Sequence, residues 1–142
     1  SLQRALNEVN EGKKAKSKLK SDYESKRKQI DALKVNLEKL SRNLEKESKV
    51  LSKDALTKKT QELQKKYLEL QNKAATYERE LKTAEAGSAK KILAALQKLV
   101  GKIADKGGYS MVIENSANTV LFSRSAEDIT SKVISAYNKG QR

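Results

Sequence analysis

The sequence contains no cysteine, histidine, proline or tryptophan, and aromatic residues make up only 4% of its 142 residues. Without thiol or imidazole groups, it lacks the usual ligands of zinc and iron–sulfur centres and the usual bases of cysteine and serine hydrolases. The 18 Asp and Glu residues show no pairing that suggests an active site. We therefore expect a protein that is not an enzyme and that uses no cofactor or metal.

Long apolar runs are also missing. The longest strongly apolar stretch covers residues 92–96, far short of the ~20 residues that a helix needs to cross a bilayer. Hydrophobic residues make up 37% of the chain and charged residues 35%, a composition typical of long helices and coiled coils. The sequence therefore predicts extended helices rather than a membrane span or a large enzyme core.

Positive charge is in excess, with 31 Lys and Arg against 18 Asp and Glu, and it is unevenly distributed. Residues 13–106 contain 26 basic and 13 acidic residues, a net charge of +13, so the two ends of the chain are together neutral. Of the basic residues 25 are Lys and 6 are Arg, which favours diffuse attraction over bidentate recognition of phosphates or bases. This pattern indicates an acidic partner surface.

Two series of mainly apolar residues follow the alternating steps of four and three that define a coiled-coil seam. The first series runs over residues 19–51 and the second over residues 56–88. The two series mirror each other, since pairs such as Leu37 and Leu70 have residue numbers that add up to 107. Antiparallel helices require this symmetry, so the sequence predicts a helical-hairpin arm over residues 13–91 that turns near residues 52–54.

The predicted turn has local support in the sequence, and the predicted seam is weak. Ser52 can cap the returning helix with its hydroxyl. Several seam positions lack a large aliphatic residue, and each such position forfeits ~1.5–3 kcal/mol of burial. These positions are Lys26, Glu47, Thr60, Ala74, Ala84 and Ser88. We therefore expect a flexible arm, with soft spots near Gly12 and Gly87.

The two ends of the chain, residues 1–12 and 92–142, are predicted to form a separate body. Gly107 and Gly108 end the second long helix, and two short apolar runs then predict a β-hairpin over residues 109–123. A start resembling a capping box predicts a C-terminal helix over residues 126–138. The predicted fold is mainly α with a small β part: a long antiparallel helical-hairpin coiled-coil arm on a small α+β oligomerisation body.

Two strands and one short helix cannot form a stable core by themselves. We therefore expect other copies of the chain to complete the body through the apolar side chains of the two runs. The residues assigned to this oligomerisation surface are Met111, Val112, Ile113, Val120, Leu121 and Phe122.

Three parts of the sequence resemble the Skp/OmpH-like periplasmic chaperone family. They are LQRALNE at 2–8 followed by GKKAK at 12–16, the charged helical hairpin, and the ending GYSMVIE at 108–114 with AEDITSKVISAYN at 126–138. The resemblance covers essentially the whole chain. It implies a periplasmic trimer whose hairpins surround a cavity that holds unfolded outer-membrane proteins without ATP. Members usually have a short apolar strand before the first of these segments, and we expect that strand and any export signal to lie outside this sequence.

This resemblance suggests a collective role for the basic arm. Many weak contacts would attract acidic unfolded clients, and anionic lipid or lipopolysaccharide at the membrane surface, through fields that fade within ~8–10 Å at physiological salt. The basic residues assigned to client binding are Lys20, Lys26, Arg27, Lys28, Lys34, Arg42, Lys49, Lys58, Lys59, Lys65, Lys66 and Lys73. The apolar ones are Val35, Val50 and Leu68. Any single lysine is more simply explained as solvating a long helix, so the hypothesis rests on their collective excess.

Two other functions fit the same charge. A Lys-rich coiled coil also binds nucleic acid at low salt, or acts as a scaffold. The scarcity of arginine and the lack of an aromatic stacking or groove-entering motif argue against specific nucleic-acid recognition. The chaperone function is therefore the leading hypothesis.

Overall fold

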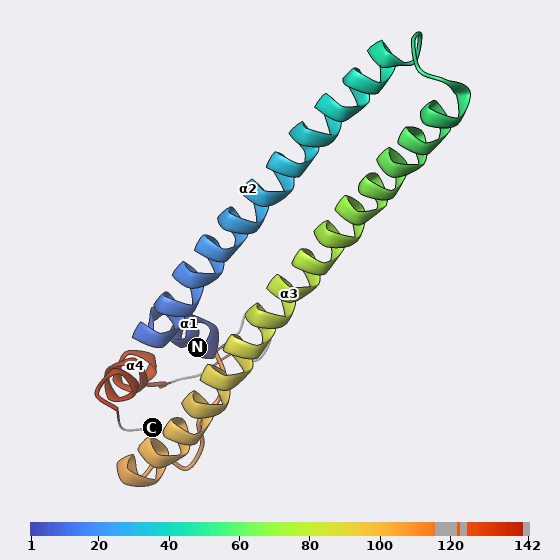
Figure 1. Ribbon diagram of the computed structural model, residues 1–142. Helices are drawn as coiled ribbons and strands as arrows, with labels where there is room; N and C mark the ends of the chain where they lie inside the picture. The colour runs from blue at the N-terminus through green and yellow to red at the C-terminus, as the bar shows by residue number, and fades with distance from the viewer. Residues whose placement is uncertain (116–121, 123–124, 141–142) are drawn as a thin grey trace. The chain divides into compact units, whose positions relative to one another are not determined.

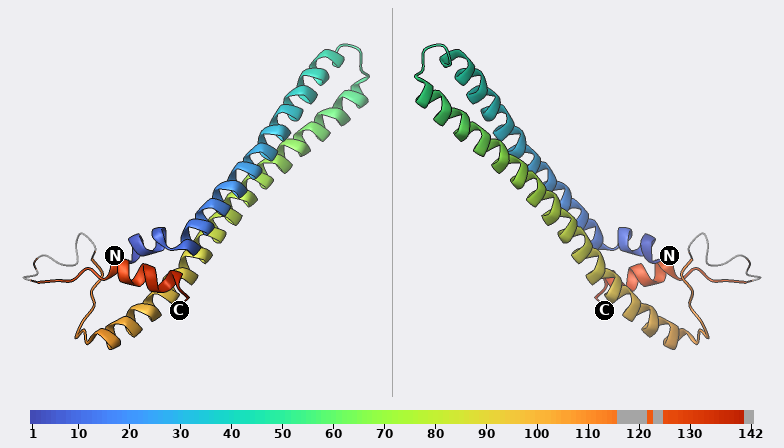
Figure 2. Two further views of the ribbon diagram at one scale, coloured as in Figure 1. Left: turned by 90° about the vertical axis from the view of Figure 1, so that its left-hand side faces the viewer. Right: turned by 90° about the vertical axis from the view of Figure 1, so that its right-hand side faces the viewer.

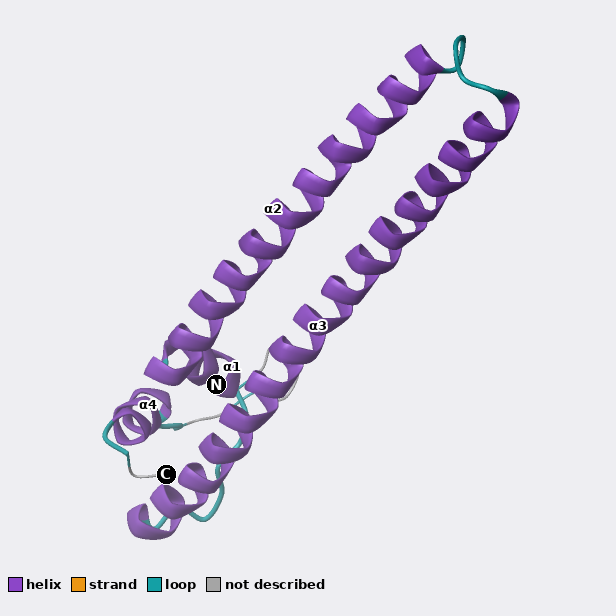
Figure 3. Ribbon diagram, viewed as in Figure 1, coloured by secondary structure: helices purple, strands orange, loops and turns teal. Residues whose placement is uncertain are grey.

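The computed structural model describes residues 1–115, 122 and 125–140, and these residues form four α-helices and no strand (Figure 3). The helices are α1 (Leu2–Glu8), α2 (Asn10–Glu47), α3 (Lys53–Gly107) and α4 (Thr130–Asn138). The prediction of a mainly α protein built on two long antiparallel helices is confirmed. The chain groups into an arm unit, Lys20–Thr83, and a body unit formed by Ser1–Leu19 with Ala84–Arg142. The arm boundaries expected from the sequence stay a prediction.

In the arm unit, α2 and α3 run antiparallel and are joined by a turn over residues 48–52 (Figures 1 and 2). Helix α2 ends at Glu47, whose carbonyl accepts hydrogen bonds from the N–H groups of residues 50 and 51 at 3.0 Å each. The Ser52 hydroxyl accepts a hydrogen bond from the Ala55 N–H at 3.3 Å, which confirms the predicted N-cap of the returning helix. The turn thus lies slightly before the position expected, near 52–54.

Polar contacts between the two helices show the register of the hairpin. The pairs in contact are Lys26 with Glu80, Lys59 with Glu47, and Tyr77 with Gln29. In each pair the residue numbers add up to 106, one less than the seam predicted, so the antiparallel register is confirmed to within one residue. Leu37 is the one buried residue of the arm unit, all of which the structure describes. The seam is therefore as loosely filled as its small and polar residues predicted.

The body unit has a continuous apolar core. Helices α1, α3 and α4 contribute to it, and Leu96 and Val9 are completely shielded from solvent. The buried members of the core are Ala5, Val9, Ile92, Leu96, Leu99, Ile103, Val133 and Tyr137. Burial of one such leucine or isoleucine contributes ~1.5–3 kcal/mol, so this core stabilises the body far more than the arm seam stabilises the hairpin.

A break at Val9 separates α1 from α2. Val9 has an extended conformation, with φ −65° and ψ 147°, and its side chain is fully buried. Gly12, in the first turn of α2, lies directly against α1, because a Cβ added there would be 1.9 Å from the Leu6 carbonyl oxygen. Gly12 is therefore a site of close packing rather than a soft spot. Gly87, the other expected soft spot, lies inside the continuous helix α3.

Helix α3 ends as the sequence predicted, at a pair of glycines. Gly108 has φ +67°, and its N–H donates to the Asp105 carbonyl at 3.4 Å. The Tyr109 N–H donates to the Ala104 carbonyl at 3.1 Å, which completes a Schellman motif. The left-handed conformation favours glycine at position 108.

The strand predicted over residues 109–113 is wrong, because residues 109–115 form neither helix nor strand. A strand needs a hydrogen-bonded neighbour, and the described part of the chain provides none for this segment. The segment is held by side chains instead: the Tyr109 hydroxyl donates to Glu127, and the Glu114 carboxylate accepts the Leu2 N–H at 2.8 and 2.9 Å. The second predicted strand, 119–123, lies outside the described residues except for Phe122, which is in a loop.

Helix α4 begins at Thr130, four residues after the predicted start at 126. The reason is the Asp128 carboxylate, which accepts hydrogen bonds from the Thr130 N–H at 2.9 Å and from the Thr130 hydroxyl. These hydrogen bonds lower the pKa of Asp128 below its usual range, with the Arg4 guanidinium adding a smaller effect. The aspartate therefore caps the helix two residues beyond itself rather than lying within it.

Candidate functional site

The basic residues assigned to client binding all lie in the arm unit, and all except Lys26 are exposed. The arm unit contains 17 Lys and Arg against 11 Asp and Glu, a net charge of +6. The body unit, with the remaining 14 basic and 7 acidic residues, has a net charge of +7. Helices α2 and α3 together account for +11 of the total, so the positive charge follows the two long helices through both units.

Lys26, one of the residues assigned to client binding, also makes contacts within the arm. Its ammonium lies 2.5 Å from the Glu80 carboxylate and 4.0 Å from the centre of the Tyr77 ring, and its side chain is 24% exposed. Lys73 lies over the same ring at 5.6 Å. Lys26 thus joins α2 to α3 through an ion pair and a cation–π contact, which together replace the missing apolar side chain of the seam.

Two other assigned cations also have acidic neighbours. Lys59 pairs with Glu47 across the turn, and Arg27 lies 3.7 Å from Asp31 on the same helix. Both pairs are exposed, and such pairs contribute ~0–1 kcal/mol each. Because water screens these exposed pairs, they are weak, and both cations remain accessible to a partner.

Apolar side chains are exposed among these charges. Val35, Val50 and Leu68, which the sequence placed outside the seam, are 49%, 84% and 58% exposed. Tyr23 and Tyr67 are also exposed, although both lie at positions of the two seam series, where side chains are expected to pack between the helices. The loose seam explains the difference, since it does not enclose these rings. The arm thus presents isolated apolar contacts on a basic surface.

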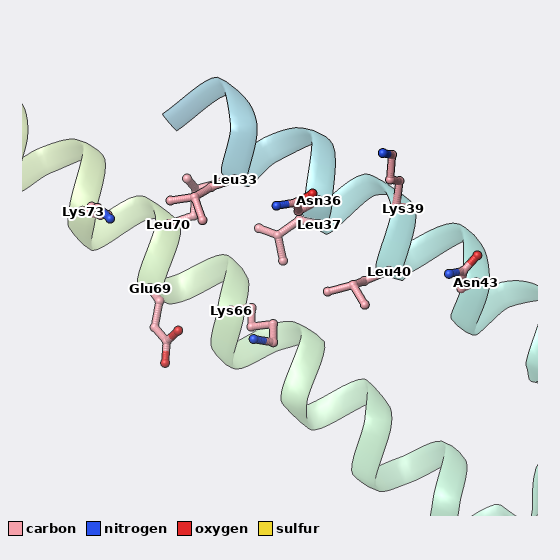
Figure 4. Close-up of a pocket in the computed structure, with 10 residues that line it drawn as sticks. All are labelled: Leu33, Asn36, Leu37, Lys39, Leu40, Asn43, Lys66, Glu69, Leu70 and Lys73. Carbon is pink, nitrogen blue, oxygen red and sulfur yellow. The ribbon is translucent and has the colours of Figure 1, made fainter. Parts of the chain in front are cut away.

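A groove of about 550 Å³ lies between α2 and α3 in the middle of the arm unit (Figure 4). Its floor consists of leucine side chains, those of Leu33, Leu37, Leu40 and Leu70. In Figure 4, Leu37 and Leu40 extend from α2 toward α3, and Leu33 lies next to Leu70. The groove is an apolar surface that the two helices leave partly uncovered.

Polar side chains border this floor on both helices. Helix α2 contributes Asn36, Lys39 and Asn43, and helix α3 contributes Lys66, Glu69 and Lys73. The border therefore carries three positive charges and one negative charge. The sequence assignment included Lys66 and Lys73 but missed the leucine floor, because seam leucines are expected to be covered by their partners.

The seam pairing explains why this floor is open. The predicted seam, with its sum of 107, pairs Leu33 with the small Ala74 and Leu40 with Tyr67. The observed contacts add up to 106 instead, which brings the polar Lys73 and Lys66 opposite these two leucines. Tyr67 is 42% exposed and does not line the groove, so it does not fill the space over Leu40, which is itself 45% exposed. Ala74 and Tyr67, at the seam positions on either side of Leu70, were the signal in the sequence that could have revealed the groove.

The oligomerisation residues are exposed where they are described. Met111, Ile113 and Phe122 are 73%, 52% and 82% exposed, and Val112 is also exposed. Val120 and Leu121 lie outside the described residues. Met111, Val112 and Ile113 thus expose three successive large apolar side chains on one loop segment.

The described residues offer neither a metal site nor a membrane-spanning segment. No group of three or more Asp and Glu side chains among them is arranged to hold a metal ion. None of the four described helices is long and apolar enough to cross a bilayer. Among the described residues, the features that a partner could contact are the basic arm, its groove and the exposed apolar loop.

Comparison with known proteins gives one assignment. The family described as "Outer membrane protein (OmpH-like)" matches residues 1–137, which include all of α1, α2 and α3 and nearly all of α4. A search among curated proteins finds no match. Proteins of this family are non-enzymatic chaperones and are typically periplasmic. Since the match extends over both units, the chain belongs to the OmpH-like (Skp) family.

Proposed function

We propose that this protein is an ATP-independent holdase that binds unfolded outer-membrane proteins and prevents their aggregation during transit through the periplasm. Membership of the OmpH-like family supports this function most strongly. The exposed lysines and scattered apolar side chains of the arm unit supply a suitable binding surface.

The chemistry of the clients explains why such a surface is suitable. Strands of outer-membrane β-barrels alternate apolar and polar residues and aggregate when they are unpaired in water. A chaperone for many such chains needs many weak contacts rather than one tight pocket. Lysines provide these contacts without strict geometry, because the ammonium is a point charge on a flexible stem. The apolar side chains between them add short-range attraction.

The client cavity requires more than one copy of the chain. We propose that the exposed loop residues Met111, Val112, Ile113 and Phe122 pack against other copies, and that three chains assemble with their basic arms around a common cavity. Burial of these side chains in an assembly would remove an apolar surface that a monomer would expose to water. Light scattering of the purified protein tests this assembly by its molar mass.

The experiment for the proposed function is an aggregation assay. A urea-unfolded outer-membrane β-barrel protein is diluted into buffer without nucleotide, and turbidity is followed with and without the chaperone. We expect suppression at stoichiometric concentration by a preparation shown to be oligomeric. If such a preparation leaves turbidity unchanged, the holdase proposal is wrong.

A pair of charge variants locates the activity. In the arm variant, Lys28, Lys34, Lys58 and Lys65 are replaced by Gln, and all four are exposed. In the control variant, Lys13, Lys16, Lys90 and Lys98 of the body unit are replaced in the same way, and these are also exposed. Both variants lose the same total charge. We expect the arm variant to suppress aggregation less well than the control, and equal losses would argue against binding along the arm.

A further inference from the structure

The groove between α2 and α3 combines two properties that the rest of the arm offers separately. Its leucine floor is an apolar surface that is exposed at Leu40 and buried at Leu37. Its border holds Lys39, Lys66 and Lys73 and the single acidic residue Glu69. Its volume of about 550 Å³ is within the ~300–1,000 Å³ typical of sites that bind small molecules or short segments. A matching ligand therefore carries apolar groups with negative charges beside them.

The dimensions favour an extended peptide segment. The floor runs from Leu33 to Leu40, seven residues along a helix, which is ~10 Å at 1.5 Å per residue. An extended chain rises ~3.3 Å per residue and points every second side chain to the same face, so about three residues span this length. Two side chains at positions i and i+2 would then reach the floor.

The border provides partners for the rest of such a segment. Asn36 and Asn43 on α2 offer amide donors and acceptors to a peptide backbone, which in an extended segment has no internal hydrogen bonds. Lys66 and Lys73 on α3 offer ammonium groups to carboxylates that alternate with the apolar side chains, whereas Lys39 on α2 extends away from α3 in Figure 4. Neither the asparagine amides nor the lysine ammonium groups require one particular residue in the bound segment, which fits binding of many different chains.

We propose that this groove is a docking site for short extended segments in which aromatic or aliphatic residues alternate with acidic ones. The proposal rests on the proposed holdase function and gives it a defined position within the arm: the groove would hold one such segment of an unfolded client while the exposed lysines attract the surrounding chain. The net positive charge of the border predicts a preference for acidic segments, which a purely apolar groove would not show.

The test uses two labelled peptides and the full chain. One 12-residue peptide alternates Phe with Glu, and the other alternates Phe with Lys; binding is measured by fluorescence anisotropy at physiological salt. We expect the Phe–Glu peptide to bind at least about tenfold more tightly than the Phe–Lys peptide. The border lysines attract the glutamates of the first peptide and repel the lysines of the second. In two-dimensional amide NMR, its shift changes would concentrate in residues 33–43 and 66–73.

Variants separate the groove from general attraction. Leu40→Gln alters the exposed part of the floor, and Lys66→Glu reverses one border charge. The control is Lys53→Glu, the same charge reversal at an exposed residue thirteen positions away, ~20 Å along α3. We expect either groove variant to weaken binding of the Phe–Glu peptide about tenfold, as the loss of one contact implies, and the control to change it less than about twofold. Circular dichroism checks that each variant retains its helices.

Several results would overturn the proposal. One is an equal effect of Lys66→Glu and Lys53→Glu, and another is a spread of NMR shift changes over all lysine-rich turns. A third is perturbation of the groove by phosphatidylglycerol vesicles but not by the Phe–Glu peptide, which would assign the groove to anionic lipid. The aggregation assay keeps the two proposals apart: if the wild-type protein and the groove variants all suppress aggregation equally, the groove proposal fails while the holdase function stands.

Discussion

A single methyl group at Gly12 provides a sharp test of the body unit. Helix propensity alone predicts that Gly→Ala inside a helix stabilises a protein by ~0.5–1 kcal/mol. At Gly12 the structure predicts the opposite, because the new Cβ would lie 1.9 Å from the Leu6 carbonyl oxygen and 3.3 Å from a Val9 methyl group. The first of these distances is impossible for non-bonded atoms. The backbone of α1 would therefore have to move away from α2.

The cost of that movement follows from what α1 buries. Ala5 and Val9 are in the core and Leu6 packs against it, so a displacement of α1 loosens their contacts with α3 and α4. Overpacking of this kind costs ~1–3 kcal/mol, which exceeds the gain in propensity. We predict that Gly12→Ala lowers the free energy of unfolding by ~1–2 kcal/mol after that gain is subtracted.

Gly87→Ala is the matched control, since nothing lies within 4 Å of a Cβ at that position in the interior of α3. It is expected to stabilise the protein by ~0.5–1 kcal/mol. Urea unfolding followed by circular dichroism at 222 nm and by tyrosine fluorescence measures both variants at one protein concentration, since assembly affects stability. Gly12→Ala with stability equal to or above that of the wild type would refute the close packing of α1 on α2.

Three further predictions concern other parts of the chain. Leu96→Ala is expected to destabilise the body unit by ~3–5 kcal/mol because Leu96 is fully buried, and urea unfolding would show it; a loss below ~1 kcal/mol would contradict the described core. Lys26→Met keeps the apolar stem but removes the ion pair with Glu80 and the contact with Tyr77, so it is expected to cost ~0.5–1.5 kcal/mol at low salt and less in 1 M NaCl; a salt-independent effect would argue against the electrostatic contact. The folded pKa of Asp128 is lowered, so its carboxylate stabilises the fold above the unfolded pKa of ~3.9, and this contribution is lost as pH falls through the lower folded value. Asp128→Asn is therefore expected to weaken the dependence of stability on pH between pH 5 and pH 2, and an unchanged dependence would show that the cap has no such role.

The hairpin could be predicted from the sequence because its determinants are periodic and local. Seam residues repeat every 3.5 positions on both helices, and mirror pairing fixed the register to within one residue of the observed Lys26–Glu80 contact. The cap residues on either side of α3, Ser52 before its start and Gly108 after its end, were equally predictable, because each depends on one residue and its nearest neighbours.

The features missed in the body depend on contacts between distant segments. The break at Val9 contains neither proline nor glycine, and it forms where that side chain enters a core built by α3 and α4. The apolar run over 109–113 has the composition of a strand but finds no strand partner among the described residues, since strand formation depends on a neighbour that local sequence cannot specify.

The candidate site was predictable as a basic surface but not as a shape. Positions of the lysines follow from the helices, and all but Lys26 are exposed as expected. The groove depends instead on which side chains of α3 lie opposite Leu33 and Leu40, and the observed register differs by one residue from the predicted one. A periodic pattern does not specify this detail. The contacts of Lys26 within the arm were not predicted, because its partners Tyr77 and Glu80 come from the opposite helix.

The most direct test of the account is to ask which part of the chain an unfolded client touches. A photo-crosslinking amino acid is introduced at Lys34 in the arm unit or at Lys98 in the body unit, both of which are exposed. Each protein is mixed with a urea-diluted outer-membrane β-barrel and irradiated. Strong crosslinking at position 34 that decreases at high salt, with weak crosslinking at position 98, is the predicted result. Crosslinking confined to position 98 would contradict capture of clients by the basic arm.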